Sequence, residues 1–546
     1  MENGQTFTYK NSFGGYFVDA SKTGDPFNEG ARPQEFTKAL NETWDYSADI
    51  IRGVNLGGWL VLEPFITPAF YQKYQRFSGF DSAEWTLSEA MRADTAGGGI
   101  QQIEKHYAEF ITEQDFAEIA GAGLNWIRLP IPYWAVEAYP GEPFAAKTSW
   151  SYALKAFQWA RKYGLRVNLD LHTIPGSQNG WNHSGKSGNI GWMAGAMGYA
   201  NAQRSLDYIR IIVEFISQPQ YKNVVPMFGI VNEPRPEHEY LEQFYLEAYT
   251  MIRRFTGIGA GNGPIISIHD SFGTQKWLDF LPGADRLALD AHRYFAFADP
   301  VFDRPCNWAG VTNQALQEFG IITGGEWSLG ELSRISSSGR FLVNGVQNIH
   351  ETTNCDFWDN YQAWNKTTKD QLTSFALASM EGLRNFFFWT WKIAPAASGN
   401  IEAPLWSYQL GLQEGYMPKD PRDATGHCQK VGASFRQFNG VLPASATGGP
   451  GAPKTLAPAA TAGIMAWPPT QFEDVPGNHE MPSYTAIGPV PTLPGPTLSP
   501  HATATISGWA YPQDTNLMSV PIEGCTYPDP WEAGTDLSAV SCPAAA

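Results

Sequence analysis

Short apolar runs alternate with helical apolar stripes along the middle of the chain. Eight runs have the length and composition of buried strands, and they span residues 51–56, 124–131, 166–171, 224–233, 264–269, 287–291, 321–326 and 385–391. Between them, apolar residues recur three and four positions apart, as in Leu206, Ile209 and Val213, which is the spacing of one helix face. Buried strands that alternate with helices in this way predict a parallel (β/α)8 TIM barrel, with a doubly wound open sheet as the alternative.

The two ends of the chain lack this alternation. Residues 1–48 are polar, with Gly, Asn and Pro throughout, and predict an N-terminal arm that precedes a barrel domain at 49–440. Residues 441–546 are rich in Pro, Ala, Thr and Gly and predict a low-complexity C-terminal extension without strands or helices. Its scattered aromatic residues predict extended segments anchored on the barrel. A small carbohydrate-binding module is the alternative, although no strand pattern supports it.

Polar side chains stand where most of the predicted strands end. In a parallel barrel the carboxyl ends of all strands open on one face, and the active site lies there. The residues that this rule brings together are Glu63, Arg128, His172, Asn232, Glu233, His292, Tyr294, Glu326 and Trp389. The sequence therefore predicts a polar site with several acids at the mouth of the barrel.

Glu233 and Glu326 are the two carboxylates whose positions best suit a catalytic pair. They end the fourth and seventh strands, which lie across the mouth of an eight-stranded barrel from each other. Glycoside cleavage needs one acid to protonate the leaving oxygen and a second, about 5–5.5 Å away, to attack the sugar carbon. Pro234 predicts extended geometry at Glu233, and Gly325 predicts close approach of other groups to Glu326. Ordinary turn chemistry is the alternative for the segment around Glu233.

The neighbouring side chains suit such a pair. Arg128 is expected to keep the attacking carboxylate ionised, and Tyr294 to donate a hydrogen bond to it. Asn232 is expected to bind the sugar 2-hydroxyl, while His172 and His292 form hydrogen-bonding walls.

A metal site is a weaker alternative. Asp170 and His172 occupy alternate strand positions that share a face, and Asp290 precedes His292 by the same interval. No strong ligand motif accompanies them, and the five cysteines are far apart without a CxxC pair, so neither a metal nor a cofactor is expected.

Charge and composition limit the classes of partner that we expect this protein to bind. The formal net charge of −17 at pH 7 disfavours nucleic acid, whose phosphates such a surface repels. Aromatic residues make up 14% of the chain, and flat aromatic faces stack well on sugar rings. No apolar run reaches the roughly 18 residues of a membrane span, and the first residues lack the features of a signal peptide. We expect a signal or anchor either to have been removed from this chain or not to be encoded in it.

Seven segments together resemble the fungal exo-β-1,3-glucanases of glycoside hydrolase family 5. The resemblance extends over about residues 50–430. The segments are Arg52-Gly53-Val54-Asn55-Leu56-Gly57-Gly58-Trp59, Arg128-Leu129-Pro130-Ile131, Asp170-Leu171-His172, Gly176-Ser177-Gln178-Asn179-Gly180, Val231-Asn232-Glu233-Pro234, Gly325-Glu326-Trp327-Ser328 and Phe388-Trp389-Thr390-Trp391-Lys392.

This resemblance implies a retaining enzyme that releases glucose from the non-reducing ends of β-1,3-glucan and also transfers glucosyl groups. It implies Glu233 as acid/base and Glu326 as nucleophile. It places the other mouth residues in the sugar subsite, with Glu63 on outer hydroxyls of the terminal glucose and an aromatic clamp of Trp181 and Phe297 around the next glucose. We expect a monomer without cofactor that acts outside the cell or at the cell wall.

The chain also departs from the family. The clamp position usually holds Phe, and here it is Trp181, followed by Asn182-His183 in place of Asp-Asn. The resemblance implies a disulfide between Cys306 and Cys428, whereas Cys355 lacks its usual partner. A β-1,6-glucanase, a β-glucosidase and a non-catalytic glucan-binding wall protein therefore remain as alternatives.

Overall fold

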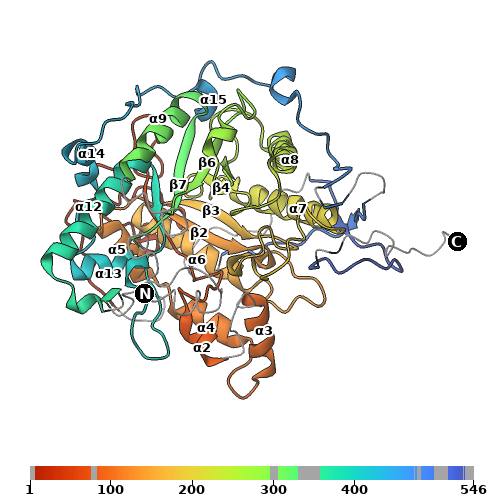
Figure 1. The fold of residues 1–546 in the computed structure, drawn as a ribbon, viewed down its shortest axis with the longest axis horizontal. Helices are drawn as coiled ribbons and strands as arrows, with labels where there is room; N and C mark the ends of the chain where they lie inside the picture. Colours follow the sequence, from red (N-terminus) through yellow and green to blue (C-terminus); the bar gives the residue numbers. More distant parts are fainter. Residues whose placement is uncertain are drawn as a thin grey trace.

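Eight parallel strands form a closed barrel in the computed structural model, with helices around it (Figure 1). The structure describes residues 6–74, 83–294, 305–329, 357–358, 360–472, 474–475, 481–496, 514–532 and 534. The barrel strands are β1 (Arg52–Asn55), β2 (Trp126–Pro132), β3 (Arg166–Thr173), β4 (Met227–Gly229), β5 (Ile265–His269), β6 (Leu287–His292), β7 (Ile321–Trp327) and β8 (Phe386–Phe388). Since β8 pairs with β1, the predicted (β/α)8 barrel is confirmed and the open sheet is excluded.

Two strands, β4 and β8, are less than half as long as the sequence predicts. The run 224–233 yields only β4 at Met227–Gly229. Pro226 has no N–H to give to a ladder, and the amides of Val224 and Val225 turn back to the carbonyl of Tyr221. β8 covers Phe386–Phe388 of the predicted 385–391.

Most helices follow the strands in alternation and cover the outside of the barrel (Figure 1). They are α1 (Ala20–Thr23), α2 (Pro68–Lys73), α3 (Glu84–Ala93), α4 (Gln101–Glu109), α5 (Glu113–Gly121), α6 (Thr148–Tyr163), α7 (Gly198–Ile216), α8 (His238–Thr256), α9 (Trp308–Glu318), α12 (Lys366–Leu383), α13 (Tyr408–Glu414), α14 (His427–Lys430) and α15 (Ala444–Thr447). A capping box opens α5: the Asp115 carboxylate accepts a hydrogen bond from the Thr112 amide at 2.8 Å.

The amino ends of the strands are closed by a layer of apolar side chains. Trp126, Met227, Ile265 and Phe387 lie in one buried cluster, against which Trp44 and Tyr46 of the N-terminal arm pack. With this end sealed, the carboxyl ends of the strands are the open side of the barrel.

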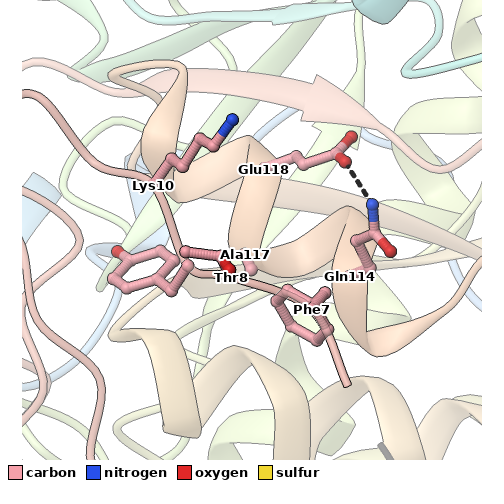
Figure 2. Close-up of a pocket in the computed structure, with 7 residues that line it drawn as sticks. Phe7, Thr8, Lys10, Gln114, Ala117 and Glu118 are labelled. Carbon is pink, nitrogen blue, oxygen red and sulfur yellow. Dashed lines mark hydrogen bonds between the residues drawn. The ribbon is translucent and has the colours of Figure 1, made fainter. Parts of the chain in front are cut away.

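The first described residues of the arm run along α5. A surface pocket of about 360 Å³ lies between them (Figure 2). Its lining residues are Phe7, Thr8, Tyr9, Lys10, Gln114, Ala117 and Glu118. Glu118 accepts a hydrogen bond from Gln114 at 2.8 Å and another from Gln409, so its carboxylate already has partners. This pocket belongs to the outer helical layer and not to the barrel mouth.

The C-terminal extension is ordered against the barrel over its described parts. Phe472, Leu493, Met518 and Trp531 are buried in the main core cluster, and the blue end of the chain lies beside α7 (Figure 1). It contains a two-stranded antiparallel sheet of β9 (Thr485–Gly488) and β10 (Met518–Val520). The prediction of an extension without strands or helices is therefore wrong at these residues and at α15 (Ala444–Thr447), because elements this short carry no readable periodicity.

Two further features complete the fold. Cys306 and Cys428 form the disulfide that the family resemblance implies, which joins the start of α9 to α14. Cys355 lies outside the described residues. Within the described part of the chain, no helix combines the length and apolar character needed to cross a membrane.

Candidate active site

Glu233 and Glu326 meet at the open end of the barrel. Both carboxyl groups are buried, and both face the imidazole of His292 at the end of β6. The His292 Nδ1 atom lies 2.6 Å from Glu233 Oε1 and 3.5 Å from Glu326 Oε2. Since one nitrogen reaches both carboxylates, they are too close for the roughly 6.5–9.5 Å of an inverting pair and suit the roughly 5–5.5 Å of a retaining pair.

Glu326 is held by two donors. The Arg128 Nη1 atom donates to its Oε1 at 2.7 Å, and the Tyr294 hydroxyl donates to its Oε2 at 2.8 Å. Burial raises the pKa of Glu326 to about 7, while Arg128 and Tyr294 act in the opposite direction by favouring the charged carboxylate. Near this residue the pairing register of β7 shifts against both neighbouring strands, β6 and β8. Such an irregularity can turn a side chain toward a site.

Glu233 lies just beyond β4 in a left-handed conformation with φ of +47°. The extended geometry predicted from Pro234 is therefore wrong. Neighbouring side chains hold this turn, because Gln178 donates to the carbonyl of Asn232 at 2.9 Å and Asn179 donates to that of Glu233 at 3.1 Å. Such a conformation costs a non-glycine residue about 1–3 kcal/mol and persists only where the surroundings enforce it.

The two carboxyl groups differ in protonation. Burial and the nearby charge of Glu326 raise the pKa of Glu233 well above its ordinary value. Glu326, in contrast, accepts hydrogen bonds from the Arg128 guanidinium and the Tyr294 hydroxyl, and both donors favour its charged form. The surroundings therefore favour the proton on Glu233 and the charge on Glu326.

The opposite wall of the site is made by His172 and Trp389. The His172 Nδ1 atom bonds Asp170 Oδ2 at 2.7 Å, so these residues share a face as the sequence predicts. The imidazole stacks on the Trp389 ring with centroids 5.6 Å apart and an interplanar angle of 9°. Gly57 makes room for this ring, since a Cβ atom there would lie 2.6 Å from Trp389. Burial lowers the pKa of His172 well below its usual value, so the ring is neutral.

The remaining predicted residues lie around this pair or outside the described chain. Asn232 accepts a hydrogen bond from Arg128 at 2.8 Å. Glu63 is buried, and within the described residues its Oε1 atom has no hydrogen-bond partner. Trp181 lies beside Phe272 with ring centroids 6.0 Å apart. Phe297, the second member of the predicted clamp, lies outside the described residues.

Comparison with known proteins agrees with this geometry. Residues 91–340 match the cellulase family, glycosyl hydrolase family 5. The barrel is a glycoside hydrolase family 5 domain. The resemblance indicated by the seven sequence segments is thereby confirmed at the level of the family.

Two curated relatives of the family 5 domain come from Aspergillus species. The chain is 37% identical over 461 residues to the probable glucan 1,3-beta-glucosidase D of Aspergillus clavatus, covering 78% of this chain and 53% of that protein. It is 36% identical over 446 residues to the protein of the same name from Aspergillus niger, covering 75% and 52%. The chain thus spans about half the length of the curated relatives it matches. The crystal structure of rutinosidase from Aspergillus niger, 21% identical with a TM-score of 0.52, covers 69% of this chain and 99% of its own, and it shares the fold.

Three further residues of the family 5 domain contact this site and were not predicted to. Asn55 accepts a hydrogen bond from Arg128 at 3.1 Å, His269 packs on His292 with ring centroids 4.4 Å apart, and His183 Nε2 lies 3.3 Å from Glu233 Oε2. Asn55 and His269 end β1 and β5, so the strand-end rule could have found both. His183 lies in a loop, and only the folded structure brings it to the carboxylate.

One expectation about glycine needs correction. The absence of a side chain at Gly325 does allow a close approach, but it lets the Asp290 carboxylate approach the Gly325 backbone and does not bring other groups to Glu326. A Cβ atom at Gly325 would lie 1.8 Å from Asp290 Oδ1. The glycine therefore serves the layer of carboxylates behind the site.

The family 5 domain also brings together three groups of a type that bind metals. Among the described residues, ligand atoms of Glu233, His269 and His292 lie within 4.8 Å of one another. This set differs from the one that the sequence suggests, because Asp170 and Asp290 instead contact Arg128, with Nη2 to carboxylate distances of 3.1 and 3.5 Å.

Proposed function

We propose that this protein is a retaining, exo-acting β-1,3-glucan hydrolase that releases glucose from non-reducing ends. The observation that carries the proposal is the contact of one imidazole nitrogen with both carboxylates, of which only Glu326 also accepts hydrogen bonds from Arg128 and Tyr294 among the described residues. The names of the curated relatives support β-1,3-glucan as the substrate.

In the first step, Glu326 attacks the anomeric carbon while Glu233 gives its proton to the glycosidic oxygen. The bond to the leaving sugar breaks, and a covalent glucosyl ester forms on Glu326. Arg128 and Tyr294 keep the Glu326 carboxylate ionised before attack. In the second step, Glu233 removes a proton from water, which displaces Glu326 and releases glucose with its original configuration. A sugar hydroxyl in place of water gives transfer.

The test is glucose release from laminarin. Glu326→Ala and Glu233→Ala are each expected to abolish turnover, and full activity in either variant contradicts the proposal. Azide separates the two roles. With Glu326→Gly it is expected to form α-glucosyl azide, because it replaces the nucleophile. With Glu233→Ala the covalent ester forms only from an activated aryl β-glucoside, whose leaving group needs no proton, and azide is then expected to give β-glucosyl azide.

Linkage preference and location belong to the same proposal. The departures at Trp181 and His183 lie next to the acid, so a product profile on β-1,3- and β-1,6-linked oligosaccharides is the decisive comparison with the alternative linkages. A glucan-binding wall protein would instead bind insoluble glucan without releasing reducing sugar. The substrate supports action outside the cell or at its surface, and a native transcript that encodes neither signal nor anchor contradicts this.

A further inference from the structure

The loop between β3 and α7 forms one side of the proposed site, and it has two different faces. On the inner face, the Trp181 ring stacks on His183 with centroids 5.7 Å apart, and His183 lies 3.3 Å from Glu233. The loop closes on itself through a hydrogen bond from the Gly188 amide to the Gly180 carbonyl at 2.8 Å. A shift of this loop therefore moves Trp181 and His183 together.

On its outer face the loop is in direct contact with the C-terminal extension. The Asn201 side-chain nitrogen donates to the Pro530 carbonyl at 2.7 Å and to the Gly191 carbonyl at 2.8 Å, so one amide joins both backbones. A Cβ atom at Gly191 would lie 2.9 Å from the Pro530 oxygen. Glu532 contacts the loop itself, because its carboxylate accepts a hydrogen bond from the side-chain amide of Asn189 at 2.8 Å.

Trp531 also contacts the same loop indirectly, through Trp85. Its side chain is 3% exposed, its indole N–H donates to Glu142 at 3.2 Å, and its ring lies 5.0 Å from that of Trp85. The Trp85 amide in turn donates to the carbonyl of Gly185 in the loop at 2.9 Å. An aromatic side chain buried this completely fixes the backbone that packs on it.

We infer that residues 529–532 of the extension are a positioning element for the leaving-group side of the active site. They hold the loop so that Trp181 supports the departing sugar within reach of the Glu233 proton. Misplacing a positioning group by about 1 Å costs up to roughly a hundredfold in rate, so a distant support can control a reaction. This inference rests on the proposed hydrolase function, and it gives the extension a role that its composition did not reveal.

The test compares two substrates in Trp531→Ala. Laminaritriose needs the leaving-group platform, whereas β-glucosyl fluoride has no leaving sugar. We expect KM for laminaritriose to rise about tenfold, with KM for β-glucosyl fluoride changed less than about twofold. Equal changes for both substrates, or no change for either, would overturn the inference. If Trp531→Ala does not fold, Glu532→Gln decides by the same comparison, because its side chain is 57% exposed.

Two controls accompany this comparison. Trp467→Ala removes another tryptophan of the extension, whose ring packs on Tyr199 and Phe244 of α7 and α8, and it should leave the substrate ratio unchanged. Trypsin cleavage after Lys186 reports the loop without any activity and should accelerate in Trp531→Ala but not in Trp467→Ala. If the wild-type protein fails to cleave laminaritriose, the proposed function fails, and the rate of tryptic cleavage still decides whether the extension holds the loop.

Discussion

The hydrogen bond from Tyr294 to Glu326 makes a quantitative prediction about pH dependence. In Tyr294→Phe the ring remains and the 2.8 Å bond to the carboxylate is lost. A hydrogen bond to a charged group contributes about 1.5–3 kcal/mol. At about 1.36 kcal/mol per unit, its removal should raise the pKa of Glu326 by roughly 1–2 units.

The direction follows from the role of the charge. Tyr294 stabilises the ionised carboxylate, and Glu326 must be ionised to attack, so its loss moves the acidic limb of activity to higher pH. The assay is kcat/KM for laminarin oligosaccharides across the pH range. The apparent values belong to the Glu233–Glu326 pair, and the displacement of the acidic limb is the quantity to compare.

The matched control is Tyr408→Phe. Tyr408 is fully buried whereas Tyr294 is partly buried, and the Tyr408 hydroxyl has no hydrogen-bond partner within the described residues, so the same atom is removed without touching a carboxylate. Its pH profile should coincide with that of the wild-type protein. An acidic limb that stays in place in Tyr294→Phe, or that moves to lower pH, would refute the reasoning.

Three further predictions follow from other contacts of the site and the fold. Asn232 donates toward His183 Nδ1, which leaves the Nε2 atom of His183 to donate to the ionised form of Glu233. His183→Ala removes this donor and should raise the pKa of Glu233, so the basic limb of the pH profile should move to higher pH by less than about one unit. A basic limb that does not move contradicts this. Treatment with EDTA should leave glucose release unchanged, and loss of activity that zinc restores would favour a metal-dependent hydrolase. Cys306→Ser should lower the free energy of unfolding by about 4–5 kcal/mol, as expected for a disulfide that closes a loop of more than 100 residues, and a denaturation midpoint equal to that of the wild-type protein would contradict it.

The sequence predicts the barrel because its signal is repeated eight times. Each apolar run needs only approximate bounds, and errors at single ends, as at β4, do not alter the count. Arg128, His172 and Glu326 could be predicted for a related reason: they lie on or at the ends of strands, and the barrel rule converts a position in sequence into a position in space.

Features that depend on distant contacts, such as the backbone conformation of Glu233 and the position of His183, could not be predicted in this way. Glu233 adopts φ of +47° because the side chains of Gln178 and Asn179 hold its turn. These hydrogen bonds outweigh the preference for extended geometry that Pro234 imposes on the residue before it. His183 reaches the acid from a loop without regular periodicity. Trp531 is buried by residues of the barrel that lie hundreds of positions earlier. The scattered aromatic residues of the extension predict that it is anchored on the barrel, but they do not predict where Trp531 packs.

The charge balance of the site explains why Glu233 can act as an acid. Arg128 contacts three carboxylates, those of Asp170, Asp290 and Glu326, and one positive charge cannot neutralise all of them. In a buried site the remaining acids then retain protons. Burial raises the pKa of Glu233 well above its ordinary value, and the charge of Glu326 raises it further. The position of Arg128 beside Glu326 therefore favours the negative charge on Glu326 and the proton on Glu233, as the proposed roles of the two residues require.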